Sequence, residues 1–369
     1  MARIAAAPQR RSNLALWALV LMGVGLLSLL PITLLDSSSG GTSGSGIIAS
    51  SGSRIAYFAF DRNADTLWLA DPKAPSKRAK GLTIEHAPEY GIIPTLSPDG
   101  RSVAYLVLPP STPAPGPDAP AELWVTSTTG ATPRLVASGA DLLVPAVWTA
   151  DGQGLVFRRS DNATHLILAG PGGGETEVAS SADALFPVGF AGVSLYYVEL
   201  SERGSVLKST QGATALLLSD GLTRDWALSP DGTRIAYLEM TLSGSQASSR
   251  AFLLDLARGT RTPVGNAGSN AFSPVWTAEG DLVIGQLDDG VPSGAAFVTQ
   301  RGATSTFTSP ERGFDVPLAN DTQAGLAVMS FDAANINNPG RASLVVVGPD
   351  GIRREITSEE VTFLGWISP

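Results

Sequence analysis

The sequence predicts an all-β fold in which one short four-stranded unit recurs along the chain, preceded by a single apolar helix. Three observations support this prediction: a composition rich in turn residues, a segment that repeats itself every 40 to 52 residues, and an uncharged stretch near the N-terminus. The 369 residues include 40 glycines and 26 prolines, and only 16% of the residues are charged. This composition is typical of proteins with many short strands and tight turns.

The uncharged stretch, residues 14–35 (LALWALVLMGVGLLSLLPITLL), is long enough to cross a membrane. As a helix its 22 residues would span about 33 Å, against a hydrocarbon thickness of about 30 Å. Arg3, Arg10 and Arg11 precede it and no acid occurs before Asp36, so residues 1–13 are predicted to be cytoplasmic. A cleaved secretory signal is the alternative, but its apolar region would be shorter and would end in a small-x-small site. Both readings place the rest of the chain outside the cytoplasm, in the periplasm or the extracellular space.

The Ser/Gly-rich residues 36–46 (DSSSGGTSGSG) predict a flexible tether between this anchor and the remaining domain, residues 47–369. A coil of this composition and length has an r.m.s. reach of about 18 Å.

Internal repeats provide the strongest signal for the fold. LSPDGRSVAYLV (96–107) and LSPDGTRIAYLE (228–239) are near copies, and WTADGQGLVFRR (148–159) and WTAEGDLVIGQL (276–287) follow the same pattern. Weaker copies make seven, with turns at positions 51, 99, 151, 191, 231, 279 and 321. A period of 40 to 50 residues built from short strands is typical of propeller blades. We therefore expect one β-propeller, with seven four-stranded blades favoured over six.

Each repeat contains four candidate strands, which in the second repeat are 95–97, 102–108, 122–126 and 133–137. The Asp-Gly pair between the first two predicts a hairpin turn, because glycine accepts positive φ and aspartate hydrogen-bonds the local backbone. The following Ile/Val-Ala-Tyr segment is apolar enough to pack against a neighbouring blade. Trp148, Trp276 and Trp366 hold the same place in their repeats and are expected to contribute to blade packing.

These motifs resemble the propeller repeat of the TolB family, whose signature is approximately W-S-P-D-G-x-x-I-A-F. The resemblance covers about residues 47–369. It differs from TolB itself, which has an additional N-terminal α/β domain and six blades. The resemblance implies a propeller built from the repeats of this family.

The two ends of the repeat region predict how the ring closes. The last residues, 365–369 (GWISP), match the first part of a repeat, and residues 51–57 (SGSRIAY) match its remainder. A blade shared between both ends would remove exposed edge strands, so we expect the C-terminal strand to pair with the first.

The sequence offers little catalytic chemistry, and we therefore predict a binding protein rather than an enzyme. With no cysteine, disulfides, thiolate metal sites and cysteine nucleophiles are excluded, and His86 and His165 are the only histidines. His86, in a loop, is interpreted as a solvated side chain, and His165 opens a strand with Asp161 as its one nearby acid. No nucleophile elbow, metalloprotease motif, P-loop or dinucleotide fingerprint occurs, so no catalytic residue, metal site or cofactor is predicted. The turn aspartates are expected to stabilise their own turns.

Topology indicates where a partner would bind. Connections between blades and between the second and third strands emerge on one face, together with long segments at 83–93, 109–121, 239–250, 286–294 and 331–341. Variable loops on a rigid scaffold commonly carry binding function. The candidate binding residues on this face are Glu89, Tyr90, Asp141, Phe186, Arg224, Asp225, Trp226, Asn270, Phe314 and Asp315.

The predicted function is a membrane-anchored interaction or scaffold module of the cell envelope, bound to an envelope protein or peptide. From Asp36 onward 34 acidic and 22 basic residues give a net charge of −12, which disfavours nucleic acid as a ligand. A propeller that senses a sugar, peptide or cation is the first alternative. A propeller hydrolase or lyase that uses two of Asp141, Asp225 and Asp315 is the second.

Overall fold

The structure, a computed structural model, describes residues 53–367 except 114, 117, 171–172, 213–214, 244–245, 289–290, 300–303, 334 and 336–337. The chain divides into two units, residues 1–44 and 45–369, and every described residue belongs to the second. The predicted cytoplasmic segment 1–13, anchor 14–35 and tether 36–46 thus lie outside the described residues. Within the described residues, no helix has the length and hydropathy needed to cross a bilayer.

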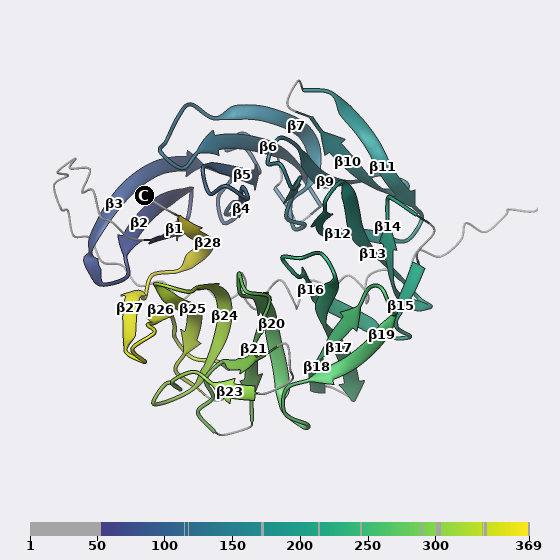
Figure 1. Cartoon of the computed structure of the whole chain (residues 1–369). Helices are drawn as coiled ribbons and strands as arrows, with labels where there is room; N and C mark the ends of the chain where they lie inside the picture. Colours follow the sequence, from purple (N-terminus) through teal and green to yellow (C-terminus); the bar gives the residue numbers. More distant parts are fainter. Residues whose placement is uncertain are drawn as a thin grey trace, which may run out of the picture. The chain divides into compact units, whose positions relative to one another are not determined.

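The described residues form seven four-stranded antiparallel sheets arranged as the blades of a ring (Figure 1). From the innermost to the outermost strand, the first two blades are β28 (Val361–Ile367), β1 (Arg54–Asp61), β2 (Ala64–Asp71), β3 (Ala74–Glu85), and β4 (Ile93–Leu96), β5 (Ser102–Val107), β6 (Pro120–Ser127), β7 (Arg134–Asp141). The third and fourth are β8 (Val147–Trp148), β9 (Leu155–Ser160), β10 (Thr164–Ala169), β11 (Glu175–Ser181), and β12 (Ala184–Ala191), β13 (Ser194–Ser201), β14 (Gly204–Ser209), β15 (Ala215–Ser219). The fifth is β16 (Leu222–Leu228), β17 (Arg234–Ser243), β18 (Gln246–Asp255), β19 (Thr260–Val264). The last two are β20 (Asn270–Trp276), β21 (Leu282–Leu287), β22 (Ala296–Val298), β23 (Thr304–Thr306), and β24 (Phe314–Asp321), β25 (Gly325–Phe331), β26 (Ala342–Val347), β27 (Arg353–Thr357). The prediction of seven four-stranded blades is confirmed.

The ring closes in the predicted way, with β28 as the innermost strand of the first blade. β28 pairs antiparallel with β1, from Arg54 opposite Ile367 to Ala59 opposite Val361. The Phe60 amide donates to the Glu360 carbonyl at 2.9 Å, next to this ladder. The first blade therefore contains strands from both ends of the repeat region, which joins the ends of the ring without an unpaired inner edge.

The Asp-Gly turns have the predicted conformation. Gly100, Gly152 and Gly232 have φ between 68° and 70°, which glycine adopts without the steric cost of a Cβ atom. In each turn the aspartate accepts a hydrogen bond from a hydroxyl two residues earlier: Ser97 to Asp99 and Thr149 to Asp151 at 2.6 Å, and Ser229 to Asp231 at 2.5 Å. Each aspartate also accepts from the amide two residues later. The prediction that these aspartates stabilise their own turns is confirmed.

These hydrogen bonds predict a specific acid sensitivity. Hydroxyl and amide donors lower the pKa of Asp99, Asp151 and Asp231 below the usual aspartate value. A lowered folded-state pKa stabilises the fold above the unfolded pKa of about 4, and this contribution is lost as the pH falls through the folded value. We expect S97A/T149V/S229A to flatten the decrease in Tm between pH 5 and pH 2 relative to the wild type, as measured by circular dichroism. An unchanged slope would show that the turn carboxylates do not contribute.

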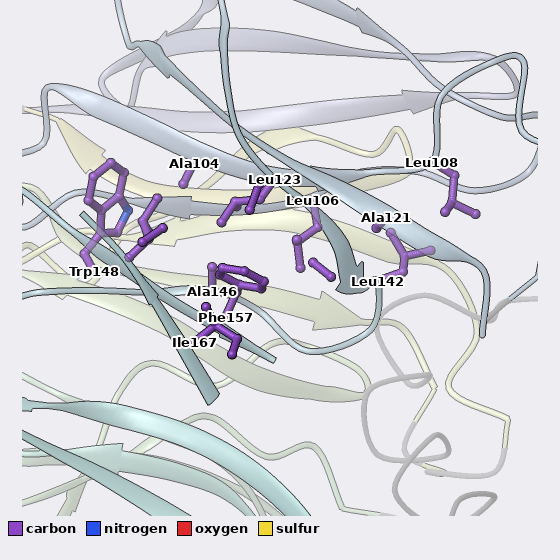
Figure 2. Packing of buried hydrophobic residues seen from close by; sticks show 14 of the residues in the cluster. Ala104, Leu106, Leu108, Ala121, Leu123, Leu142, Ala146, Trp148, Phe157 and Ile167 are labelled. Carbon is purple, nitrogen blue, oxygen red and sulfur yellow. The ribbon is translucent and has the colours of Figure 1, made fainter. Parts of the chain in front are cut away.

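The hydrophobic core lies between successive blades. One cluster joins the second blade, through Leu106 and Leu123, to the third, through Trp148, Phe157 and Ile167, and Figure 2 shows these side chains stacked between the two sheets. Comparable clusters join other neighbouring blades. The predicted apolar Val/Ile-Ala-Tyr segments, 103–105 and 235–237, are buried within these interfaces.

The three repeat tryptophans stabilise the contact between neighbouring blades, as expected. Each indole Nε1 donates to a backbone carbonyl in the innermost strand of the preceding blade: Trp148 to Thr95 at 3.3 Å, Trp276 to Ala227 at 2.9 Å and Trp366 to Ala319 at 3.4 Å. A buried indole N–H needs an acceptor, and the adjacent strand provides it at each site. The indole N–H groups of these three side chains are thus used in contacts between blades.

The face that carries the connections between blades, here named the inter-blade face, differs from the prediction at one segment. Residues 239–250 were expected to form an irregular loop, but β17 and β18 continue through them as a regular hairpin to the pair Ser243–Gln246. The β17–β18 ladder extends beyond the β16 pairing, which ends at Leu222–Met240. The opposite face, here named the tight-turn face, carries the Asp-Gly turns.

Candidate functional site

The ten candidate binding residues lie in three places on the inter-blade side of the ring. Asp141, Phe186, Arg224, Asp225 and Trp226 follow one another across the second to fifth blades. Glu89 and Tyr90 lie in the connection between the first and second blades, and Asn270, Phe314 and Asp315 lie in the last two blades.

The first group forms a connected series, here named the interblade cluster, through one residue that was not predicted. Arg158 on β9 ion-pairs with the Asp141 carboxylate at the end of β7, and Ser160 donates to the same carboxylate at 2.7 Å. The Arg158 guanidinium lies 4.8 Å from the centre of the Phe186 ring on β12. Phe186 in turn contacts Trp226 on β16, with ring centres 5.4 Å apart. Figure 1 shows the four strands β7, β9, β12 and β16 in successive blades.

Burial separates the supporting members of this cluster from the accessible ones. Arg158 is 3% exposed and Phe186 is 7% exposed, so both are internal. Burial lowers the Arg158 pKa, and the Asp141 charge and hydrogen bond partly offset this effect. Trp226 is half-buried, and its indole donates to Thr223 at 2.9 Å, which fixes the ring beside Phe186. The buried members thus hold the β16 segment in place.

Arg224 and Asp225 lie next to Trp226 in a β-bulge. Arg224 is opposite Leu238 and Ala227 is opposite Ala236, so two residues, Asp225 and Trp226, oppose a single residue of β17. Asp225 has φ of 53°, in the left-handed region that residues other than glycine rarely adopt. Bulges re-aim side chains, and such backbone conformations are concentrated at binding sites.

The guanidinium of Arg224 binds the adjacent carboxylate. Its Nε and Nη2 atoms donate to Asp225 Oδ2 at 3.0 and 2.9 Å, and the two side chains are 23% and 28% exposed. The pair therefore keeps both charges within reach of solvent.

This pair is distinctive among the innermost strands. Within the described strands β4, β8, β12, β16, β20, β24 and β28, the charged residues are Arg224, Asp225, Asp315 and Asp321. Asp315 is fully buried, and Asp321 ends its strand in a turn, where it accepts from the amides of Gln323 and Ala324. Arg224 and Asp225 are thus the partly exposed charges of these strands that lie toward the inter-blade face, beside an aromatic ring, whereas the half-buried Asp321 lies at the tight-turn end of β24.

The last group of candidates consists of structural residues. Arg353 on β27 donates to both carboxylate oxygens of Asp315, at 2.7 and 2.8 Å. Phe314 is 2% exposed and stacks between Phe272 and Phe331. The Asn270 side-chain oxygen accepts from the Ser249 amide at 3.1 Å and holds the β17–β18 hairpin against the next blade. The buried ion pair removes Asp315 from the set of carboxylates that could act on a substrate.

The connection between the first and second blades is held to the β1–β2 turn. Glu89, with φ of 70°, donates its amide to the Arg62 carbonyl at 2.9 Å, and its carboxylate pairs with the Arg62 guanidinium at 2.9 Å. Tyr90 packs against the core between the second and third blades.

The interpretation of His86 as a solvated side chain is wrong. Its ring is fully buried, stacks on Phe60 with centres 5.8 Å apart, donates from Nδ1 to the Ala87 carbonyl at 2.9 Å, and places Nε2 3.5 Å from Asp65 Oδ1. Burial opposes protonation, but the Asp65 carboxylate and the Ala87 carbonyl outweigh it and raise the His86 pKa. His165 is also ordered, between Glu177 at 2.8 Å and Asp161 at 3.3 Å, and its side chain is 20% exposed. Asp65 of the His86 pair and Glu177 of the His165 pair come from other strands, so sequence proximity did not indicate them, whereas Asp161 lies four residues before His165.

Arg158 was missed, although the repeats contain a signal for it. When WTADGQGLVFRR is aligned with LSPDGRSVAYLV, Arg158 takes the place of the buried Leu106. A charge at an otherwise apolar repeat position predicts a buried ion pair. Arg353 had no comparable signal, since its partner Asp315 lies 38 residues earlier in the chain.

Comparison with known proteins agrees with the geometry of the ring. No family model matches the sequence, and no curated protein matches it. Solved structures do match. The fold is a seven-bladed β-propeller.

The similar structures include TolB from Acinetobacter baumannii, at 18% identity over 70% of this chain and 64% of that chain, with a TM-score of 0.49. The β-propeller domain of the Trilobed protease from Pyrococcus furiosus is 13% identical over 84% of this chain and 96% of that chain, with a TM-score of 0.56. Oligogalacturonate lyase from Vibrio parahaemolyticus is 10% identical over 81% and 92%, with a TM-score of 0.52. This chain therefore spans about two thirds of the TolB structure and nearly the whole of the other two.

These similarities concern the fold alone, and one structural difference is visible. The Pyrococcus furiosus domain is described as having an open velcro topology. In this chain, β28 pairs with β1 and closes the first blade.

The comparisons overturn the prediction that the chain is not an enzyme. Structures with this fold include the propeller of a protease and an oligogalacturonate lyase. The absence of sequence motifs was a poor criterion, because a propeller can place catalytic side chains from separate blades together without any local pattern. The fold is compatible with catalysis as well as with binding.

Proposed function

We propose that the chain is a propeller of the cell envelope, anchored through residues 14–35, that binds a protein or peptide partner on its inter-blade face. The observation that carries the proposal is the Arg224–Asp225 pair beside Trp226. These residues combine two accessible charges of opposite sign with an aromatic surface on a fixed bulge. Such a combination suits a polypeptide, which offers carboxylates, amides and apolar side chains within a short distance.

The interblade cluster supports this role by fixing the site before a partner arrives. Trp226 is fixed by Thr223 and Phe186, and Phe186 is fixed by Arg158. A preorganised site loses less conformational entropy on binding than a loop that must become ordered.

A matched pair of variants tests the proposal. We expect R224Q/D225N in the full chain to reduce capture of the partner from solubilised native membranes at least tenfold, because paired charges at an interface contribute about 2 kcal/mol or more. Quantitative mass spectrometry of the captured proteins measures the change. The control is D255N/R258Q, which removes an Arg–Asp ion pair with an N–O distance of 2.8 Å. This pair lies at the β18–β19 turn on the tight-turn face. Equal loss in both variants, or loss in neither, would count against the inter-blade site.

Catalysis is the second candidate function, and Asp225 is the observation that favours it. Its carboxylate is partly exposed beside a guanidinium, and its backbone lies in the left-handed region. A carboxylate next to a cation could abstract or donate a proton while the cation stabilises a developing negative charge. Assays of the full chain with peptides and with polyuronates, repeated with D225N, separate this function from binding: turnover lost in D225N would support it, and no turnover would exclude these substrates.

A further inference from the structure

Lysine is rare in this chain and unevenly placed. The chain has four lysines, and Lys73, Lys77 and Lys80 fall within eight residues, in the β2–β3 turn and on β3. All three are exposed, and none has an ion-pair partner among the described residues. The fourth, Lys208, is bound to Glu199 at 2.6 Å. Three unpaired ammonium groups are thus concentrated on one edge of a domain whose overall charge is negative.

Lys73, Lys77 and Lys80 are here named the lysine strip. Protection of the edge strand does not explain why this strip consists of lysine. Lysines on an edge strand can prevent pairing with other chains. The six other outermost strands of the ring face solvent in the same way without lysine: β15 and β23 carry no charged residue, and β7, β11, β19 and β27 carry arginine or acidic residues instead. The lysines without an ion-pair partner thus belong to the first blade alone.

The strip lies where the chain enters the ring. Ile55 pairs with Ala70, and Ala70 pairs with Arg78, so the beginning of β1 and the lysine-bearing half of β3 are at the same end of one sheet. Residues 36–52 connect this end to the predicted anchor at 14–35. The reach of about 18 Å predicted for residues 36–46 would keep the strip close to the membrane surface.

We propose that Lys73, Lys77 and Lys80 contact the anionic lipid headgroups of the membrane that holds the chain. The contact turns the tight-turn face toward the bilayer and leaves the inter-blade face free for its partner. It rests on the proposed membrane anchoring. Ammonium groups attract phosphate headgroups within about a Debye length of 8 Å, and acidic residues of the tight-turn face beyond that distance are screened. Asp71, in the same turn as Lys73, accepts a hydrogen bond from the Lys73 amide at 2.9 Å and offsets part of the positive charge of the three lysines.

Arg78, although within the strip, is not part of the lipid contact. Its guanidinium binds both carboxylate oxygens of Glu359, at 3.2 and 3.1 Å, and lies 4.3 Å from the centre of the Trp68 ring. The three lysines therefore supply the available charge.

The absence of cysteine allows a direct measurement of orientation. A fluorophore on Thr132→Cys, in the exposed β6–β7 turn on the tight-turn face, labels a single site in the full chain. Energy transfer to an acceptor lipid is measured in phosphatidylcholine vesicles with and without about 30% phosphatidylglycerol. We expect greater transfer with phosphatidylglycerol. The variant K73Q/K77Q/K80Q should reduce the contact equilibrium about a hundredfold, since each lysine near an anionic surface contributes about fivefold.

The matched control is R203Q/R250Q/R312Q, which removes three exposed charges from the inter-blade side. It should leave the transfer unchanged. Equal transfer in both vesicle types, or equal loss in both triple variants, would overturn the proposal, as would binding of single-stranded DNA by the strip without any response to phosphatidylglycerol.

Flotation of the same samples separates this proposal from the anchor. Association with pure phosphatidylcholine reports the anchor, whereas the additional association with phosphatidylglycerol reports the lysines. If residues 14–35 do not anchor the chain, the additional association with phosphatidylglycerol still tests the lipid contact. Loss of this additional association in K73Q/K77Q/K80Q supports the proposal, and its persistence contradicts the proposal.

Discussion

Deleting residues 361–369 is expected to abolish cooperative folding of the ring. The deletion removes β28, whose buried Val361, Leu364 and Ile367 would each contribute about 2 kcal/mol by burial. It also exposes the inner edge of β1 and breaks the hydrogen bond from Trp366 to Ala319. The stabilisation lost through these three effects together is comparable with the total stability of an ordinary domain, about 5–15 kcal/mol. Near-ultraviolet circular dichroism and urea unfolding measure the loss.

Two milder variants keep this prediction testable if the truncated chain does not fold. Leu364→Ala removes a side chain that is 8% exposed and should lower the free energy of unfolding by about 2–4 kcal/mol. Thr362→Ala, at an exposed position of the same strand, should have little effect. Removing only residues 368–369 provides the control for the deletion itself. An unaltered Tm after loss of 361–369 would refute closure by β28.

Asp315→Asn is expected to cost about 3 kcal/mol of stability, because it leaves Arg353 without its anionic partner. Asp315 is 0% exposed and the Arg353 side chain is 19% exposed, so solvent replaces the lost charge only poorly. The remaining partners of Arg353, the Thr308 carbonyl and the Ser330 hydroxyl, are neutral. Breaking one side of a buried ion pair typically destabilises by about 3–5 kcal/mol.

The neighbouring ion pair provides the control. Asp350 and Arg354 are 2.6 Å apart but more exposed, so Asp350→Asn should change the stability little. The double variant D315N/R353Q should be less destabilised than D315N alone, since it leaves no unpaired buried charge. Urea unfolding of the wild type, D315N, R353Q and D315N/R353Q gives the coupling energy, and a coupling of zero would show that the two groups do not stabilise each other.

Much of the fold could be predicted because it depends on local chemistry that recurs. The Asp-Gly pairs at 99–100, 151–152 and 231–232 determine tight turns through their own hydroxyl, amide and glycine contacts. The spacing of these turns sets the number of blades. The match between the two ends of the repeat region indicated that β28 would complete the first blade.

The candidate site could be predicted only in part. The topology of a four-stranded blade placed Asp141, Phe186 and Trp226 on the same side of the ring, and the structure joins them through Arg158. Sequence reasoning could not separate them from Asp315, because the ion pair that buries Asp315 depends on a strand 38 residues later.

The sequence by itself determined the repeat, the tight turns and the closure of the ring, since each depends on residues close together or on a pattern that recurs. The tertiary structure decided which charged groups are buried. His86, interpreted as solvated, is enclosed by Phe60 and Asp65, whereas Arg224 and Asp225 remain accessible. The physical reason is that the cost of burying a charge depends on partners from other strands and blades, and these are brought together only when the ring has formed.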